Sequence, residues 1–308
     1  MIRVKIVMLL LSIMFLISSN CIALQHSLGV GVGVTPDYEG SEDHQVIPML
    51  MLSGRYDSGR SFSLAGPKLK VDLLPNRNYS IGPVVNYNMG RSDVDNSQVD
   101  TMKDIDGTLE AGVWGGINYN NWNFGLELLK DILDEHSGMR VQASAGYRWK
   151  ATDQLSIIPG VSFTYADEDY MQTFFGVNSS NRGGSSLPDY SADSGLKDVG
   201  AKILANYTPW EKWGLTTILS YTMLLNDAKD SPLVYGQGDD KQMFFGLMAT
   251  YSWGQRTRNI PTSLSRRRVH IVPVKKFGLV RPHVFYKSST SFKLPPFNNV
   301  FNCLMSPL

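Results

Sequence analysis

Three histidines between residues 24 and 253 could take part in catalysis or metal binding: His26, His44 and His136. A Ser–His hydrolase needs a histidine within hydrogen-bond reach of a serine and a polar group to orient it. Zinc needs further Cys or His ligands at suitable spacing. His26 lies beside the expected start of the mature chain, His44 stands in an acidic segment, and His136 belongs to a Ser-Gly turn. The sequence therefore predicts no catalytic residue, no cofactor and no metal site, and we expect the protein not to be an enzyme.

Acidic residues concentrate in five long segments, which hold 22 of the 28 acids but only six basic residues and so carry a net charge of −16. Asp93 and Asp95, like Asp104 and Asp106, form pairs without the Asp-x-Asp-x-Asp-Gly spacing of a calcium loop. One interpretation is ordinary solvated loops. The other is that the carboxylates bind divalent cations or exclude anions at the mouth of a pore. The five segments are 35–46, 90–106, 131–138, 166–198 and 225–241.

The net charge of +1 conceals three unlike parts of the 308-residue chain. Residues 1–23 carry two basic residues and no acid, residues 24–253 carry 17 basic against 28 acidic residues, and residues 254–308 carry ten basic residues and no acid. The middle part therefore has a charge of −11 and the last part a charge of +10. We treat the chain as three segments.

The first segment, residues 1–23, has the form of a secretory signal peptide. Arg3 and Lys5 precede an apolar run over 6–17, and small residues lead to a cleavage site after Ala23. The run is too short to span a bilayer, which takes about 20 residues. The alternative, a lipoprotein signal acylated at Cys21, fits poorly because Ser18 and Asn20 fill the two critical positions before the cysteine.

The middle segment, residues 24–253, alternates between apolar and polar residues, which is typical of β-strands with one apolar and one polar face. In 155–165 the apolar positions are odd-numbered, whereas in 122–128 they are even-numbered. Strands of about 9 to 12 residues, with aromatic residues near their ends, fit a tilted barrel in a membrane. The expected strands are 27–34, 47–56, 61–66, 69–74, 79–89, 107–117, 122–130, 139–149, 155–165, 199–207, 213–224 and 242–253.

These twelve strands alternate between short turns and the long acidic loops, as in an antiparallel outer-membrane barrel with both ends in the periplasm. The sheet must close, because lipid offers no partner to an unpaired backbone edge. The strand pattern is weakest over 61–74, where two short strands meet at Gly66 and Pro67, so a barrel of ten strands remains an alternative. Gly29, Gly31 and Gly33 in the first strand are expected to face inward and leave room in a narrow barrel.

The polar face of these strands carries charged residues that suit a wet lumen. Twelve strands lie between the eight that side chains can fill and the 16 to 18 that leave an aqueous channel. The charged side chains therefore either pair and plug the bore or line a pore. They are Glu110, Glu127, Arg140, Arg148 and Lys202.

The run Thr35 to Ser41, TPDYEGS, resembles the opening motif of the MipA/OmpV family of MltA-interacting proteins, and further motifs follow in the family's order over about 30–253. They include DIDG at 104–107, HSG at 136–138, YADEDYMQTFFGV at 165–177, SLPDYSADSGLKDV at 186–199 and LNDAKDSPL at 225–233. The motif residues singled out are Pro36, Asp37, Tyr38, Glu39, Gly40, Asp104, Asp106, Tyr170, Pro188, Tyr190, Asp227, Ser231 and Pro232.

The resemblance implies a barrel of the Gram-negative outer membrane without known catalysis, in contact with the lipid bilayer, lipopolysaccharide and the outer-membrane assembly machinery. It also implies a scaffold that joins a murein-degrading lytic transglycosylase to a murein-synthesising penicillin-binding protein. Two alternatives stay open. One is a porin-like channel for small solutes, and the other is a surface adhesin that acts through the longest loop, 166–198.

The last expected strand ends on Tyr251 and Trp253, and the resemblance makes its aromatic end an assembly signal. Residues 254–308 continue with six of the fifteen prolines and no strand or helix pattern. One hypothesis is a basic periplasmic arm for acidic partners. The favoured one is translation in a wrong frame or through a lost stop codon. A signal peptide directs the chain away from nucleic acid, so no nucleic-acid partner is expected.

Overall fold

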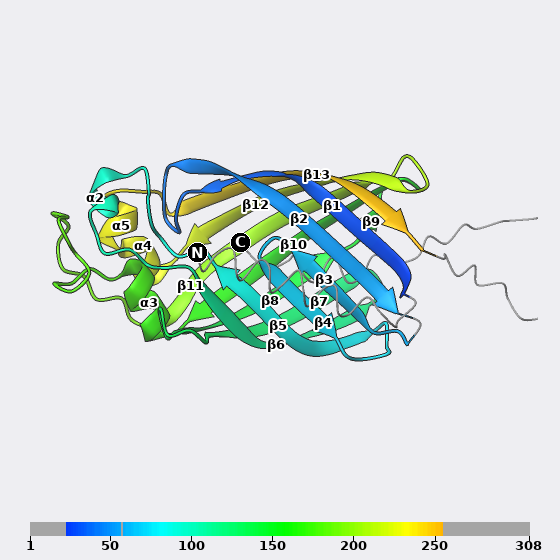
Figure 1. The fold of residues 1–308 in the computed structure, drawn as a ribbon, viewed down its shortest axis with the longest axis horizontal. Coiled ribbons are helices and arrows are strands. Elements are labelled where there is room, and N and C mark those ends of the chain that lie inside the picture. The colour runs from blue at the N-terminus through cyan, green and yellow to red at the C-terminus, as the bar shows by residue number, and fades with distance from the viewer. Residues whose placement is uncertain (1–22, 57, 255–308) are drawn as a thin grey trace, which may run out of the picture.

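The computed structural model describes residues 23–56 and 58–254, which form one closed antiparallel β-barrel (Figure 1). The sheet runs in the order β11-β12-β13-β1-β2-β3-β4-β5-β6-β7-β8-β10, and β11 pairs with β10 to close it. The two-residue β9 continues β8 along β10, so the wall has twelve strands. The strands are β1 Ala23–Pro36, β2 His44–Tyr56, β3 Ser61–Ala65, β4 Lys68–Asp72, β5 Tyr79–Asn88, β6 Thr108–Tyr119, β7 Trp122–Asp131, β8 Met139–Tyr147, β9 Trp149–Lys150, β10 Leu155–Ala166, β11 Gly195–Tyr207, β12 Trp213–Leu224 and β13 Lys241–Trp253.

This arrangement confirms the predicted barrel of twelve strands, and the alternative of ten is wrong. The uncertain stretch at 61–74 forms a genuine hairpin, in which Ala65 pairs with Lys68 across Gly66 and Pro67. Gly66 has a φ of 54°, which glycine adopts without the penalty that a Cβ would bring. Both strands of this hairpin have only five residues, so their short sequence patterns were hard to interpret.

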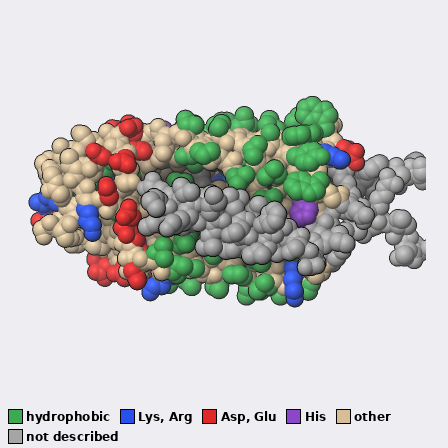
Figure 2. All heavy atoms as spheres, viewed as in Figure 1, with side chains coloured by type: hydrophobic (Ala, Val, Ile, Leu, Met, Phe, Trp, Pro, Cys, Tyr) green, Lys and Arg blue, Asp and Glu red, His purple; other side chains and the backbone are tan. Residues whose placement is uncertain are grey.

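Alternation along each strand sends apolar side chains outward. In β13, Met243, Phe245 and Leu247 are exposed, whereas Met248 and Thr250 are buried inside. Figure 2 shows hydrophobic side chains spread over the outer wall between the two ends of the barrel. The outer wall therefore presents an apolar surface to lipid, as a membrane-spanning barrel requires.

The glycines of β1 face inward, as the sequence predicted, while Val30, Val32 and Val34 between them face outward. The Cβ of a larger residue at Gly31 would lie 2.0 Å from the carbonyl oxygen of Leu247 on the neighbouring strand. That distance lies inside van der Waals contact, so glycine is required where β1 and β13 approach each other.

Four short helices gather at one end of the barrel, which we call the loop end (Figure 1). They are α2 Ser97–Asp100, α3 Glu168–Phe175, α4 Asn226–Asp230 and α5 Pro232–Tyr235. The short connections lie at the opposite end, the turn end. Within the part of the chain that the structure describes, no helix is long and apolar enough to cross a membrane.

The last strand ends at Trp253, where the sequence placed it, and Trp253 pairs with His26 of the first strand. The proposed signal peptide, apart from Ala23, and the basic tail, apart from Gly254, lie outside the described residues. Cleavage after Ala23, acylation of Cys21 and the origin of the tail therefore stay predictions.

Candidate functional site

The long loops form a packed structure at the loop end, which we call the cap. We number its five loops in chain order and define them as residues 37–43, 90–106, 132–138, 167–194 and 225–240. Two hydrophobic clusters lie inside it, one around Phe175 and Val234 and one around Val99 and Leu233. The acidic loops thus bury apolar side chains against one another, while most of their carboxylates stay exposed to solvent. Motif residues hold much of this structure together.

Glu39 joins the first loop to the fourth and to β11. Its carboxylate accepts a hydrogen bond from the Tyr170 hydroxyl (3.1 Å) and forms an ion pair with Lys197. Tyr170 is buried and stacks on Phe174, with 4.5 Å between ring centroids, while the His136 ring meets it edge-on at 5.2 Å. Helix α3, which carries Tyr170, is capped at its N-terminus by Asp167, whose side chain accepts from the Tyr170 N–H.

A second group of motif residues joins the fourth loop to the fifth. The Tyr190 hydroxyl donates to the Asp227 carbonyl oxygen (3.0 Å), and the Asp227 carboxylate accepts from the Asp193 N–H (2.7 Å). Ser231 is fully buried and donates its hydroxyl to the Phe175 carbonyl oxygen (2.6 Å). Pro232 follows it as the first residue of α5, where a missing N–H costs no hydrogen bond.

A third group joins the first loop to its neighbours on either side. Pro36 ends β1, and the Asp37 carboxylate accepts from the Asp95 N–H of the second loop (2.9 Å). Tyr38 is buried and donates its hydroxyl to the Gln237 carbonyl oxygen (3.4 Å). Gly40 adopts a φ of 100°, and a Cβ there would lie 2.5 Å from a methyl group of Val234.

Three motif residues stand apart from these contacts. The Asp106 N–H donates to Glu135 of the third loop (3.0 Å), Asp104 contributes a negative charge near Arg91, and Pro188 is exposed. Most motif residues thus build the cap. The cap does not assemble their side chains into a constellation that would bind a ligand.

Burial in the cap changes the acid–base behaviour of several groups. Burial raises the pKa of Tyr38 to about 12, against a smaller lowering effect of Arg91. Burial together with the nearby Asp227 raises the pKa of Tyr190 to about 12. Burial raises the pKa of Tyr170 as well, with the Glu39 charge acting in the same direction. Burial lowers the pKa of Arg91 to about 10, although Tyr38 and Asp104 oppose that shift.

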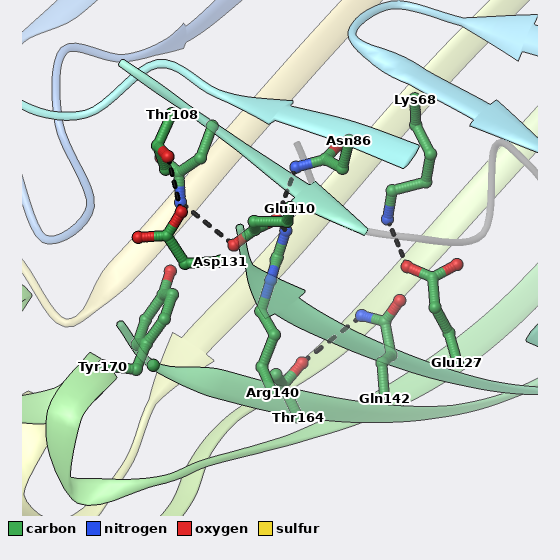
Figure 3. Close-up of polar contacts among 12 residues, drawn as sticks. Lys68, Asn86, Thr108, Glu110, Glu127, Asp131, Arg140, Gln142, Thr164 and Tyr170 are labelled. Atoms are coloured by element: carbon green, nitrogen blue, oxygen red, sulfur yellow. Dashed lines mark hydrogen bonds and ion pairs between the residues drawn. The ribbon is translucent and has the colours of Figure 1, made fainter. Parts of the chain in front are cut away.

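The bore beneath the cap contains two charged clusters, which Figure 3 shows in close-up. The first surrounds Glu110 of β6, whose side chain is only 1% exposed. Its carboxylate accepts from Arg140 Nη2 (2.6 Å) and Asn86 Nδ2 (2.8 Å), and His136 Nε2 lies 3.5 Å away. Nearby, Asp131 accepts from the Thr108 hydroxyl (2.6 Å) and from the N–H of His136 (2.8 Å).

The second cluster lies farther along the bore, where Glu127 receives two lysines. The Nζ atoms of Lys68 and Lys70 each lie 2.6 Å from one of its carboxylate oxygens. Lys70 also lies over the Trp114 ring, 5.4 Å from its centroid. A small cavity borders this cluster and is lined by Lys70, Trp114, Glu127, Gln142 and Ser144 among others.

Inward-facing apolar side chains fill another part of the bore. They form one cluster that joins β2 and β3 to β10, β11, β12 and β13, with Phe244 packed against it. Its members are Met49, Met51, Ala65, Ile158, Leu204, Ile218 and Met248.

Two of the charged residues expected in the lumen, Glu110 and Arg140, pair with each other, whereas Glu127 pairs with two lysines that the sequence analysis did not single out.

The apolar cluster was also missed, although β13 carried a signal. Phe244 and Met248 occupy the even, inward positions of β13, where a wet lumen would favour polar residues. The two charged clusters and the apolar cluster in the bore join strands to one another and so stabilise the barrel. In the described residues, no group of three or more His, Cys, Asp and Glu side chains is placed to hold a metal ion.

Known proteins resemble this chain in sequence and in fold. The family model described as "MltA-interacting protein MipA" matches residues 28–253. A relative from Escherichia coli O157:H7 named "Putative outer membrane protein YiaT" is 22% identical over 249 residues, covering 79% of this chain and 96% of the relative. Its counterpart from strain K12 is 24% identical over 164 residues, covering 53% of this chain and 63% of the relative.

Two solved porins align with the barrel over most of their length. The NanC porin has a TM-score of 0.40 at 10% identity, covering 73% of this chain and 98% of its own. The KdgM porin has a TM-score of 0.39 at 11% identity, covering 74% of this chain and 99% of its own.

Proposed function

Because the chain belongs to the MltA-interacting protein MipA family, we propose that it is a non-catalytic scaffold which holds a murein-degrading lytic transglycosylase and a murein-synthesising penicillin-binding protein together beneath the outer membrane. The observation that carries this proposal is the filled bore. Ion pairs around Glu110 and Glu127 and the apolar cluster around Met248 occupy the interior, under a packed cap. A filled barrel favours a protein that acts through its surfaces.

The surface available to periplasmic enzymes is the turn end, because barrels of this kind place their short turns in the periplasm. Four basic side chains are exposed there, namely Arg60, Arg77, Lys150 and Lys212. Among the residues of these turns that the structure describes, the exposed acids are Asp153 and Glu211, and the sequence places one further acid, Asp57, in the turn at 57–60. The turn end therefore contrasts with the acidic loop end, and its positive charge would favour partners that present an acidic surface.

The proposal is tested by a pull-down from solubilised cell envelope with the full chain as bait. We expect murein hydrolases and synthases to be recovered with the unmodified protein. The double variant Arg77→Glu, Lys212→Glu should lose them, because it reverses charge at the turn end. Lys103→Glu reverses a single charge at the loop end and should retain them. Equal recovery by all three proteins, or recovery by none, would contradict the scaffold.

A channel for small solutes is the competing proposal, and the small cavity beside Lys70 and Glu127 inside the bore favours it. Recordings from the purified protein in a planar bilayer separate the two. Stepwise conductance contradicts the filled scaffold, whereas a silent bilayer contradicts the channel. The adhesin hypothesis stays a prediction. It requires that deletion of 177–189 within the fourth loop reduce binding to host cells.

A further inference from the structure

The methionines of the barrel fall into two separate sets. Among the nine that the structure describes, five are buried, three in the apolar cluster of the bore and two in the cap. The other four lie on the outer wall at the loop end, and we call them the rim methionines. They are Met89, Met139, Met223 and Met243.

All four rim methionines lie where their strands meet the loop end. Met139 begins β8, Met223 is the last but one residue of β12, Met243 is the third residue of β13, and Met89 directly follows β5. Met89 and Met243 are 53% and 51% exposed. Met139 and Met223 are half-buried, and each precedes an inward-facing residue, so alternation places both on the outer face. Those inward-facing residues are Arg140 and Leu224.

The opposite rim of the barrel carries tryptophan instead, which is a common anchor at a membrane interface. All five exposed tryptophans belong to the turn end, and none of the described methionines does. The rim that barrels of this kind turn toward the cell exterior therefore presents thioethers. A thioether is apolar like a leucine side chain, but its sulfur can be oxidised reversibly. The five tryptophans are Trp122, Trp149, Trp210, Trp213 and Trp253.

Oxidation at the rim would change the height of the apolar belt. A methionine sulfoxide is polar, so it no longer belongs to the lipid-facing surface. The next outward residue toward the bilayer centre lies two positions along the strand, at Tyr221 in β12 and at Phe245 in β13. Two residues of a strand tilted by about 40° span about 5 Å of height. Oxidation therefore lowers the outer edge of the belt on β5, β8, β12 and β13, and a thinner belt fits a thinner bilayer.

We propose that the rim methionines are a modification site, at which hydrogen peroxide, a small neutral oxidant, converts each thioether to a sulfoxide and so thins the apolar belt. In this step the peroxide O–O bond breaks, one oxygen bonds to the sulfur lone pair, and the other leaves as water. The sulfur is oxidised by two electrons and the peroxide is reduced. The site is independent of the murein scaffold, because it uses the outer rim and leaves the turn end unchanged.

Met243 and Met248 offer a matched pair for the test, because one strand carries both and turns them to opposite faces. The full chain is reconstituted in phospholipid vesicles, treated with hydrogen peroxide and digested, and each methionine sulfoxide is measured by mass spectrometry. We expect Met243 to be oxidised at least about tenfold faster than Met248 in the folded barrel, and both at the same rate in the urea-unfolded chain. Equal rates in the folded barrel would overturn the proposal.

The effect on the belt is tested by urea unfolding in two bilayers, thin dilauroylphosphatidylcholine and thicker dioleoylphosphatidylcholine. Oxidation should lower the urea midpoint of the unmodified chain more in the thicker bilayer than in the thin one. The variant Met89→Leu, Met139→Leu, Met223→Leu, Met243→Leu keeps an apolar rim without sulfur, so its midpoint should not respond to peroxide. Reduction of the oxidised, unfolded chain by methionine sulfoxide reductases before refolding should restore the midpoint of the unmodified chain. No fall, an equal fall in both bilayers, or the same fall in the leucine variant would contradict the modification site.

Discussion

Removing the carboxylate of Glu110 should destabilise the barrel strongly, because this one side chain joins three strands. It receives Asn86 from β5 and Arg140 from β8 while it belongs to β6. In Glu110→Ala the Arg140 guanidinium, whose side chain is 12% exposed, keeps its charge without its carboxylate. Breaking a buried pair in this way costs about 3–5 kcal/mol. The lost acceptor of Asn86 adds about 1 kcal/mol.

The assay is urea unfolding of the refolded protein in lipid vesicles, followed by the shift between folded and unfolded bands on an unboiled gel. We expect the free energy of unfolding to fall by about 4–6 kcal/mol in Glu110→Ala, the sum of these two costs. Asp153→Ala at the exposed turn end should change it by less than about 0.5 kcal/mol. The double variant Glu110→Ala, Arg140→Met should recover part of the loss, because it leaves no unpaired charge.

Two results would refute this reasoning. The first is a Glu110→Ala protein that unfolds at the same urea concentration as the unmodified barrel. The second is strict additivity of the Glu110→Ala and Arg140→Met effects, which would mean that the two groups do not interact in a desolvated site. Either result would indicate that water enters the bore freely and would weaken the case for a filled barrel.

Three further outcomes follow from the seam, the cap and the tyrosines. Gly31→Val should prevent assembly of a heat-modifiable barrel, because its Cβ would lie 2.0 Å from a backbone carbonyl oxygen. Gly115→Ala should assemble normally, because its Cβ would lie 3.7 Å from the Ser80 carbonyl oxygen, which is ordinary contact. Phe175→Ala should destabilise the cap by about 3–5 kcal/mol, measured as faster protease cleavage at the loop end of the intact barrel. Tyr38 has a pKa of about 12 in the folded protein and its ordinary pKa of 10.0 in the unfolded chain, so between pH 10 and 12 only the unfolded chain loses this proton. The free energy of unfolding should therefore fall over this range by at most about 2.7 kcal/mol. Tyr38→Phe should remove that part of the fall in unfolding curves measured at alkaline pH.

The strands could be predicted from the sequence because alternation is a local signal. Even the brief hairpin at Gly66 and Pro67 was visible as two short strands, and β12 has the predicted bounds of 213–224. The inward position of Gly29, Gly31 and Gly33 followed from the same alternation. These features depend on neighbouring residues, which one sequence displays directly.

The partners inside the bore and the cap could not be predicted, because they depend on the stagger between strands and on contacts across the chain. The Glu39–Lys197 pair joins residues 158 positions apart. Lys68 reaches Glu127 only through the register of the strands between them. Helix α3 carried a local signal, since Tyr170, Met171, Phe174 and Phe175 recur at helical spacing, but its eight residues are too few to stand out.

The seam between β1 and β13 has a consequence for how the barrel folds. Most strands pair with their neighbours in sequence, so those hairpins form through short loops. The seam instead joins the two ends of the barrel, and the Ser252 and Ser27 hydroxyls that meet there are 225 positions apart. Such a contact raises the contact order and slows folding. Until it forms, the first and last strands each present an unpaired edge, which lipid does not tolerate. Assembly therefore has to shield both edges until β13 is in place, so an interruption late in translation would leave the whole sheet open rather than one strand short.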